Sequence, residues 1–205
     1  PKYSVNVDSI MNFIGFEKVL LNNRSVKLNK GMYLDFNAIA KGYCVDLLSN
    51  ALKKNNITNH LIEIGGEMYA SGINNITNTR WKVGISDPLK PDDTKQKIFL
   101  KNIALASSGN YRKFLIDPET GVKIVHTINP NNGSANQTNI LASSVIAENC
   151  MTADAYATAF MAMPLDKSIS LINDDKSLDG MIIYFDSNNE IQTYYSSGFK
   201  KLIFD

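Results

Sequence analysis

Apolar residues recur at helical spacing in two stretches of the chain. The first covers residues 38–54, where Ala38, Val45, Leu48 and Leu52 fall on one side of a helix. Asn37 precedes this run and is a suitable N-cap, because its side-chain oxygen can accept from an N–H group one turn on. The second stretch covers 150–163 and ends at a proline, and a shorter helix is expected at 165–173.

Between these helices lie short apolar runs of the length typical of strands. Examples are residues 60–64, 80–85, 103–106 and 140–147. Turn-forming residues join other pairs of runs into hairpins, at 22–24, 117–121 and 186–190. Because most strands are joined by tight turns, the pattern favours an α+β fold, with a mixed, largely antiparallel sheet and packed helices.

Composition narrows the class of protein. The 205 residues are 44% hydrophobic, which is enough for a single domain with a sizeable core. Formal net charge is +1 and basic residues are scattered, so we expect no nucleic-acid partner. Apolar runs stay well short of the roughly 20 residues of a membrane span. Cys44 and Cys150 fit no zinc motif and are expected to be buried thiols, with a disulfide between them left open.

The start of the first helix carries candidate chemistry. Asp35 precedes the helix and Lys41 lies within its first turn. Free N–H groups at a helix N-terminus favour anions such as phosphate, and Lys41 would add a positive charge. A capped helix with an ordinary surface lysine would show the same pattern, so both interpretations remain open.

Two further groups are candidates. Asp154 and Thr158 are four residues apart and share one face of the second helix, where a carboxylate and a hydroxyl would suit Mg²⁺ or Ca²⁺. Alternatively, Asp154 is paired locally and Thr158 bonds back to its carbonyl. His126 ends a predicted strand, where it could act as a general base or simply bond a neighbouring carbonyl.

Six segments together resemble the ApbE family, the FAD:protein FMN transferases. Asp-Phe-Asn-Ala-Ile-Ala-Lys-Gly-Tyr at 35–43 resembles the family's Asp-Leu-Gly-Ala-Ile-Ala-Lys-Gly-Tyr, and the segments at 64–67 and 81–88 resemble Ile-Gly-Gly-Asp and Trp-x-Val-Gly-Ile-x-x-Pro. The segments at 107–111, 126–133 and 151–159 resemble Thr-Ser-Gly-Asp-Tyr, His-Ile-x-Asp-Pro-x-x-Gly and Ala-Asp-Ala-Leu-Ser-Thr-Ala. Their order along the chain is also that of the family.

The resemblance implies a set of roles. Mg²⁺ would be held by the side chains of Asp154 and Thr158 and by the backbone carbonyl of Ala38. FAD, the substrate, would contact Asp35 and Lys41 and lie along Thr127 and Ile128, with His126 as catalytic base. The implied reaction moves FMN from FAD to a Thr or Ser hydroxyl of an acceptor protein and releases AMP. Alternatives are a Mg²⁺-dependent FAD pyrophosphatase and a non-catalytic flavin-binding fragment.

The chain departs from the family pattern at its start. Only thirty-four residues precede Asp35, whereas family members carry many more there. We therefore expect residues 1–205 to be one ApbE-like domain that lacks the family's N-terminal part. The resemblance also implies an extracytoplasmic location, in the periplasm or on the outer face of a bacterial cytoplasmic membrane, with contact to the membrane only through an N-terminal lipid anchor outside this chain.

Overall fold

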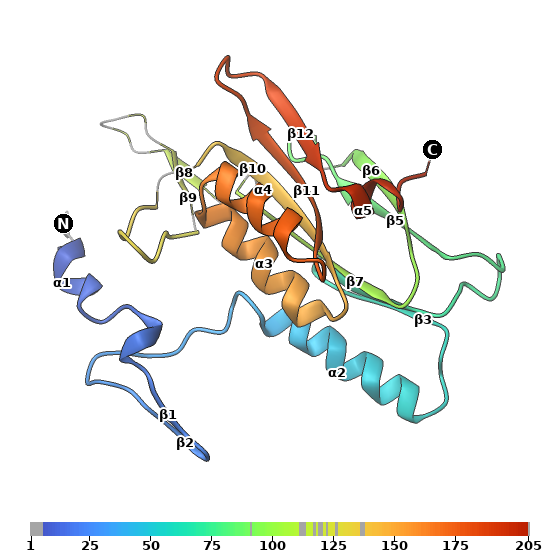
Figure 1. Cartoon of the computed structure of the whole chain (residues 1–205), viewed down its shortest axis with the longest axis horizontal. Coiled ribbons are helices and arrows are strands. Elements are labelled where there is room, and N and C mark those ends of the chain that lie inside the picture. The colour runs from blue at the N-terminus through green and yellow to red at the C-terminus, as the bar shows by residue number, and fades with distance from the viewer. Residues whose placement is uncertain are drawn as a thin grey trace.

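A six-stranded sheet forms the centre of the fold, and each neighbouring pair of its strands is antiparallel (Figure 1). The computed structural model describes residues 6–90, 92–110, 114–116, 118, 121, 123–125, 127–135 and 138–204. The order across the sheet is β12 (Ile191–Tyr195), β11 (Asp179–Phe185), β10 (Ile140–Ala147), β7 (Ile103–Gly109), β4 (Glu67–Ser71) and β3 (His60–Ile64). The predicted α+β class with a largely antiparallel sheet is confirmed.

Helices cover one face of this sheet. They are α2 (Ala40–Lys54), α3 (Cys150–Ala162) and α4 (Leu165–Asp174). Val45 of α2, Phe160 of α3 and Ile172 of α4 are buried in one cluster with Val145 and Ile182 of the sheet. Full burial of such a side chain contributes about 1.5–3 kcal/mol relative to exposure. This packing fixes α2 and α3 side by side over the sheet.

A hairpin and a short helix cover part of the opposite face. The hairpin consists of β5 (Trp81–Ser86) and β6 (Thr94–Leu100), and the helix is α5 (Ser197–Lys200). Ile98, Leu100 and Phe199 are fully buried there. Because both faces of the sheet are covered, every residue of the central strand β10 is buried, which explains why its sequence is an almost continuous run of apolar and small residues.

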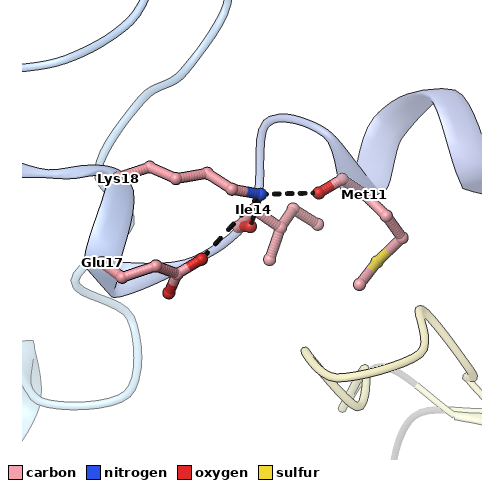
Figure 2. A network of polar contacts seen from close by, with 4 residues as sticks. All are labelled: Met11, Ile14, Glu17 and Lys18. Carbon is pink, nitrogen blue, oxygen red and sulfur yellow. Dashed lines mark hydrogen bonds and ion pairs between the residues drawn. The ribbon is translucent and has the colours of Figure 1, made fainter.

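The segment before α2 lies apart from the central sheet (Figure 1). It contains α1 (Val7–Met11), the 3₁₀ helix η1 (Phe16–Lys18) and a hairpin of β1 (Leu20–Asn22) and β2 (Ser25–Lys27). Figure 2 shows how Lys18 joins η1 to the end of α1: its ammonium donates to the carbonyls of Met11 and Ile14 and lies 4.0 Å from the Glu17 carboxylate. Several apolar side chains of the segment remain exposed, including Phe16 at 80% and Leu21 at 64%.

Most predicted elements are present, with shifted ends. The strands at 140–147 and 60–64 and the helix at 150–163 are confirmed to within a residue. A remaining small hairpin consists of β8 (Phe114–Ile116) and β9 (Lys123–Val125), and the predicted turn between them lies mostly outside the described residues. The helix α1 was not predicted. Within the described ranges, no helix is long and apolar enough to cross a membrane.

The two cysteines differ in their surroundings, which corrects the expectation that both are buried. Cys44 is exposed on α2, whereas Cys150 is buried, and the two thiols are free. Burial raises the pKa of the Cys150 thiol, and the charges of Asp46, Glu67 and Asp154 add to that effect. A thiol held protonated is a poor nucleophile.

We therefore expect one fast-reacting thiol per native chain. Iodoacetamide labelling followed by peptide mass spectrometry should modify Cys44 and leave Cys150 unmodified until the protein is unfolded. The Cys44→Ser variant provides the control, because it should react only in denaturant. Rapid labelling of Cys150 in this variant under native conditions would contradict its burial.

Candidate functional site

The N-terminal halves of α2 and α3 are joined by hydrogen bonds in both directions. The Gly42 N–H of α2 donates to Oδ2 of Asp154 on α3, over 3.0 Å. In return, the Asp46 carboxylate of α2 accepts from the Cys150 and Met151 N–H groups at the start of α3, over 2.8 and 2.9 Å. Each helix thus receives from its neighbour an acceptor for N–H groups that a helix start leaves unpaired.

This arrangement leaves a carbonyl free at the start of α2. Asn37 was predicted to cap the helix, but its side chain donates to the Asp35 carboxylate instead. The same carboxylate also accepts from the Asn37 N–H. The helix begins two residues later than expected, with Ile39 as an N-cap that has no side-chain acceptor. Because the Gly42 N–H turns to Asp154, none of the described residues donates to the carbonyl of Ala38.

Asp154 and Thr158 lie one turn apart on α3, as the sequence predicts. Asp154 is 4% exposed, and burial raises the pKa of its carboxyl, although the Gly42 hydrogen bond and the Lys41 charge oppose that shift. Thr158 is half-buried, and its hydroxyl makes no hydrogen bond to the Asp154 carbonyl or to any other described group. The local interpretation of this pair is therefore wrong for Thr158, whose oxygen remains available.

An ion pair between a half-exposed lysine and a buried carboxylate lies beside Asp154. The Lys41 ammonium is 2.6 Å from Oε2 of Glu67, which is 1% exposed at the start of β4. Burial raises the pKa of the Glu67 carboxyl, and the hydrogen bond and charge of Lys41 oppose this effect. The negative charge of Asp154 raises the same pKa further.

The charges at this place are unbalanced. Two buried carboxylates, Asp154 and Glu67, have one half-exposed ammonium between them. A nearby cation favours the charged form of such groups and would offset their burial. In the part of the chain that the structure describes, no three His, Cys, Asp or Glu side chains gather to hold a metal. A cation here would therefore depend on neutral oxygens as well as on Asp154.

The raised pKa of Glu67 predicts how stability depends on pH. The unfolded chain releases this proton near the ordinary value of 4.5, and the folded chain only at a higher pH. Between these two values the unfolded state binds fewer protons, so the free energy of unfolding falls as pH rises and then levels off. The Gln side chain of the Glu67→Gln variant cannot ionise, so the variant lacks this decrease in the free energy of unfolding. Asp154 titrates in both proteins.

We therefore compare the free energies of unfolding of Glu67→Gln and the unaltered protein, measured with urea in the presence of EDTA from pH 4 upward. The value for Glu67→Gln should increase relative to that of the unaltered protein as pH rises. Lys41→Met provides a control, because it removes the compensating charge and should enlarge the loss of stability that the unaltered protein shows. A difference between Glu67→Gln and the unaltered protein that stays constant over this range would contradict the assignment.

The other predicted residues lie beyond the far end of α3. The Thr127 hydroxyl donates to Oδ1 of Asn110, over 3.1 Å, and Asn129 donates to the Ala162 carbonyl at the end of α3. Ile128 is exposed. Asn110 is 1% exposed, and its Nδ2 has no partner among the residues that the structure describes. His126 lies outside the described residues, so its place in the site is not part of this geometry.

The structure thus brings the start of α2, which carries Lys41, against Asp154 of α3. Ala38 and Asp35 precede α2 in the chain, and Thr158 lies one turn after Asp154 on α3. The structure adds three residues that sequence reasoning missed. Glu67 had one signal, a carboxylate directly after the Gly65-Gly66 turn, and Asp46 had another, its position four residues after Gly42 on the same helix face. Asn110 also had a signal, because it lies in the segment 107–111 that resembles a family motif.

These features define a class of protein: an α+β domain whose paired helices present a backbone carbonyl, a carboxylate and a hydroxyl beside a lysine. Residues 3–182 match the model of the ApbE family, and the chain belongs to this family. The chain is 33% identical over 197 residues to the FAD:protein FMN transferase of Haemophilus influenzae, covering 93% of this chain and 56% of that protein. The transferase of Vibrio cholerae is 31% identical, covering 84% and 50%.

Solved structures agree with this assignment. The flavin transferase ApbE from Vibrio cholerae superposes with a TM-score of 0.82 at 26% identity, covering 96% of this chain and 61% of that one. An ApbE protein from Thermotoga maritima gives 0.81 at 25% identity, with 97% and 63% covered. The chain spans about half the length of the curated relatives it matches.

Proposed function

We propose that this protein transfers FMN from FAD to a Thr or Ser hydroxyl of an acceptor protein, with Mg²⁺ as cofactor and AMP as the second product. The observation that carries the proposal is the turning of the Gly42 N–H toward Asp154. It holds a buried carboxylate in place and leaves the Ala38 carbonyl free at the same helix start. The similarity to relatives named FAD:protein FMN transferases supports the reaction class.

The residues present fit Mg²⁺. The Ala38 carbonyl, the Asp154 carboxylate and the Thr158 hydroxyl are hard oxygen donors, which Mg²⁺ prefers, and Mg²⁺ commonly keeps several waters beside a few protein ligands. The excess of buried carboxylate over ammonium, described above, also favours a cation. When bound, the ion would stabilise negative charge on the pyrophosphate of FAD.

The remaining residues would bind the dinucleotide and move a proton. Lys41 is half-exposed and close to the start of α2, so its ammonium is available to a phosphate oxygen. Asp35, Thr127 and the exposed Ile128 would contact other parts of FAD. His126 would take the proton of the acceptor hydroxyl as its oxygen attacks the FMN phosphorus. The new P–O bond forms as the pyrophosphate bond breaks, and AMP leaves with the bonding electron pair.

The whole protein should be incubated with FAD, Mg²⁺ and candidate acceptor proteins or peptides. We expect AMP release measured by chromatography, and an acceptor whose mass increases by one FMN unit and whose band fluoresces in a denaturing gel. AMP and free FMN without a labelled acceptor would favour the pyrophosphatase. If neither AMP nor a labelled acceptor forms, the result would favour a non-catalytic flavin-binding domain.

We also infer from the family resemblance that the whole protein works outside the cytoplasmic membrane, held there by an N-terminal lipid anchor. Cell fractionation with an antibody against this domain tests the location. Recovery in the cytoplasmic fraction alone would contradict it, whatever the outcome of the activity assay.

A further inference from the structure

A cavity of about 380 Å³ lies on the sheet face opposite α2 and α3. Its volume is in the range of small-ligand sites. The floor carries the hydroxyls of Ser107 on β7 and Ser144 on β10, which are 2.8 Å apart, with Met68, Leu105 and Met181 around them. Glu63 is the only charged side chain among the described lining residues, and none of these is Lys, Arg or His. Such a lining is unsuited to phosphate and suits an uncharged occupant with polar groups.

A strand edge borders this cavity. Gly84, Ile85 and Ser86 of β5 line it, and β5 pairs with β6 alone among the described strands. The other edge of β5 therefore offers unpaired N–H and C=O groups, which can bind an extended peptide as an added strand. In that mode the backbone provides hydrogen bonds, and alternate side chains enter neighbouring pockets.

The cavity is separated from the Lys41 and Asp154 site by one tight turn. Gly65 and Gly66 join β3 to β4 with φ angles of 62° and 105°, which favour glycine, and both line the cavity. On the other side, an added Cβ on Gly65 would be 3.6 Å from Lys41 Cδ and 3.8 Å from the Glu67 carboxylate. An added Cβ on Gly66 would meet nothing within 4 Å. The turn therefore leaves room for a bound chain over Gly66, with the Lys41 and Glu67 side chains next to Gly65.

We propose that the β5 edge and this cavity bind an extended segment of the acceptor protein, whose hydroxyl-bearing residue passes over the Gly65-Gly66 turn toward Lys41. The proposal rests on the transferase function proposed above. A polypeptide matches the free strand edge through its amides, and a small uncharged side chain matches the serine floor. The phosphate-bearing dinucleotide would remain on the helix side of the turn.

The test uses the whole protein, FAD, Mg²⁺ and a library of short peptides that each carry one Thr or Ser. A peptide that becomes labelled with FMN is then remade with N-methyl groups at alternate residues, in two complementary sets. Because alternate N–H groups of a strand point to opposite edges, one set should abolish labelling and the other should be tolerated. Equal effects of both sets would overturn the proposal, and this experiment needs no altered protein.

A second test uses a substitution that fills the cavity. Ser107→Leu should raise the KM for the peptide about tenfold, while kcat at saturating peptide and the KM for FAD stay near their original values. Ser107→Ala, which leaves the cavity open, is the matched control and should have a smaller effect. An unchanged KM for the peptide overturns the docking site and leaves the transferase function in place. A raised KM for FAD also overturns the docking site, because it assigns the cavity to the dinucleotide. AMP release with no labelled peptide overturns the transferase function, and the docking site with it.

Discussion

Replacing Asp154 with Asn is expected to lower the rate of Mg²⁺-dependent AMP release from FAD by about two to three orders of magnitude, a loss typical of removing one electrostatic group from an active site. The Asn side chain keeps an oxygen that can accept from the Gly42 N–H, so the contact between α2 and α3 remains. What it loses is the negative charge that would hold the cation. The measurement is AMP release at increasing Mg²⁺ concentrations, together with calorimetric titration of Mg²⁺.

Asp46→Asn is a matched control for this experiment. Asp46 also accepts N–H groups across the two helices, from Cys150 and Met151, but it belongs to no candidate metal set. It should reduce stability by about 1 kcal/mol, as loss of a helix cap does, and leave the Mg²⁺ dependence unchanged. Unchanged activity and Mg²⁺ binding in Asp154→Asn would assign Asp154 a purely structural role.

The same comparison separates two contributions of one carboxylate. Asp154→Ala removes both the charge and the acceptor for Gly42, and leaves a buried N–H without a partner, which costs about 1–3 kcal/mol. A larger loss of stability in Asp154→Ala than in Asp154→Asn, with equal loss of Mg²⁺ binding, would show that the hydrogen bond stabilises the helix pair and the charge binds the cation.

Local patterns predicted the elements better than their ends. The periodicity of residues 38–54 identifies a helix because Val45 and Ser49 face the core, but its start depends on Asp154, more than a hundred residues away in the chain. Asn37 is a good cap by propensity and yet bonds Asp35, because the first turn of α2 already has an acceptor from α3. Such a tertiary cap leaves no local signal.

The site was predicted residue by residue only through the family resemblance. Spacing alone placed Asp154 and Thr158 on one helix face but left the choice between a cation site and local bonding open. The free Ala38 carbonyl and the ion pair of Lys41 with Glu67 depend on how α2, α3 and β4 pack together. Leu47 and Leu48 continue the predicted apolar pattern of α2, yet they are 50% and 46% exposed. Periodicity therefore indicated the helix without indicating which of its apolar residues are covered.

Gly42→Ala should lower the free energy of unfolding, although alanine is the better helix former. An added Cβ would lie 2.4 Å from the Cys150 carbonyl oxygen and 2.7 Å from its carbon, and both are backbone atoms of α3. Helix propensity alone favours Ala over Gly by about 1 kcal/mol and would make the variant more stable. The clash is expected to outweigh this gain, so the variant should be less stable. Overpacking of this kind costs about 1–3 kcal/mol, which urea unfolding measures directly.

The function should respond as well, because the clash separates the two helices at the hydrogen bond that joins Gly42 to Asp154. We expect Gly42→Ala to require more Mg²⁺ for half-maximal AMP release, even at temperatures where the variant is fully folded. Asn50→Ala, at an exposed position of the same helix, is the control, and it should be as stable as the unaltered protein or slightly more stable. If Gly42→Ala also gained stability, the helices would have room to move apart. The close approach at Gly42 would then not be what positions Asp154 beside the Ala38 carbonyl.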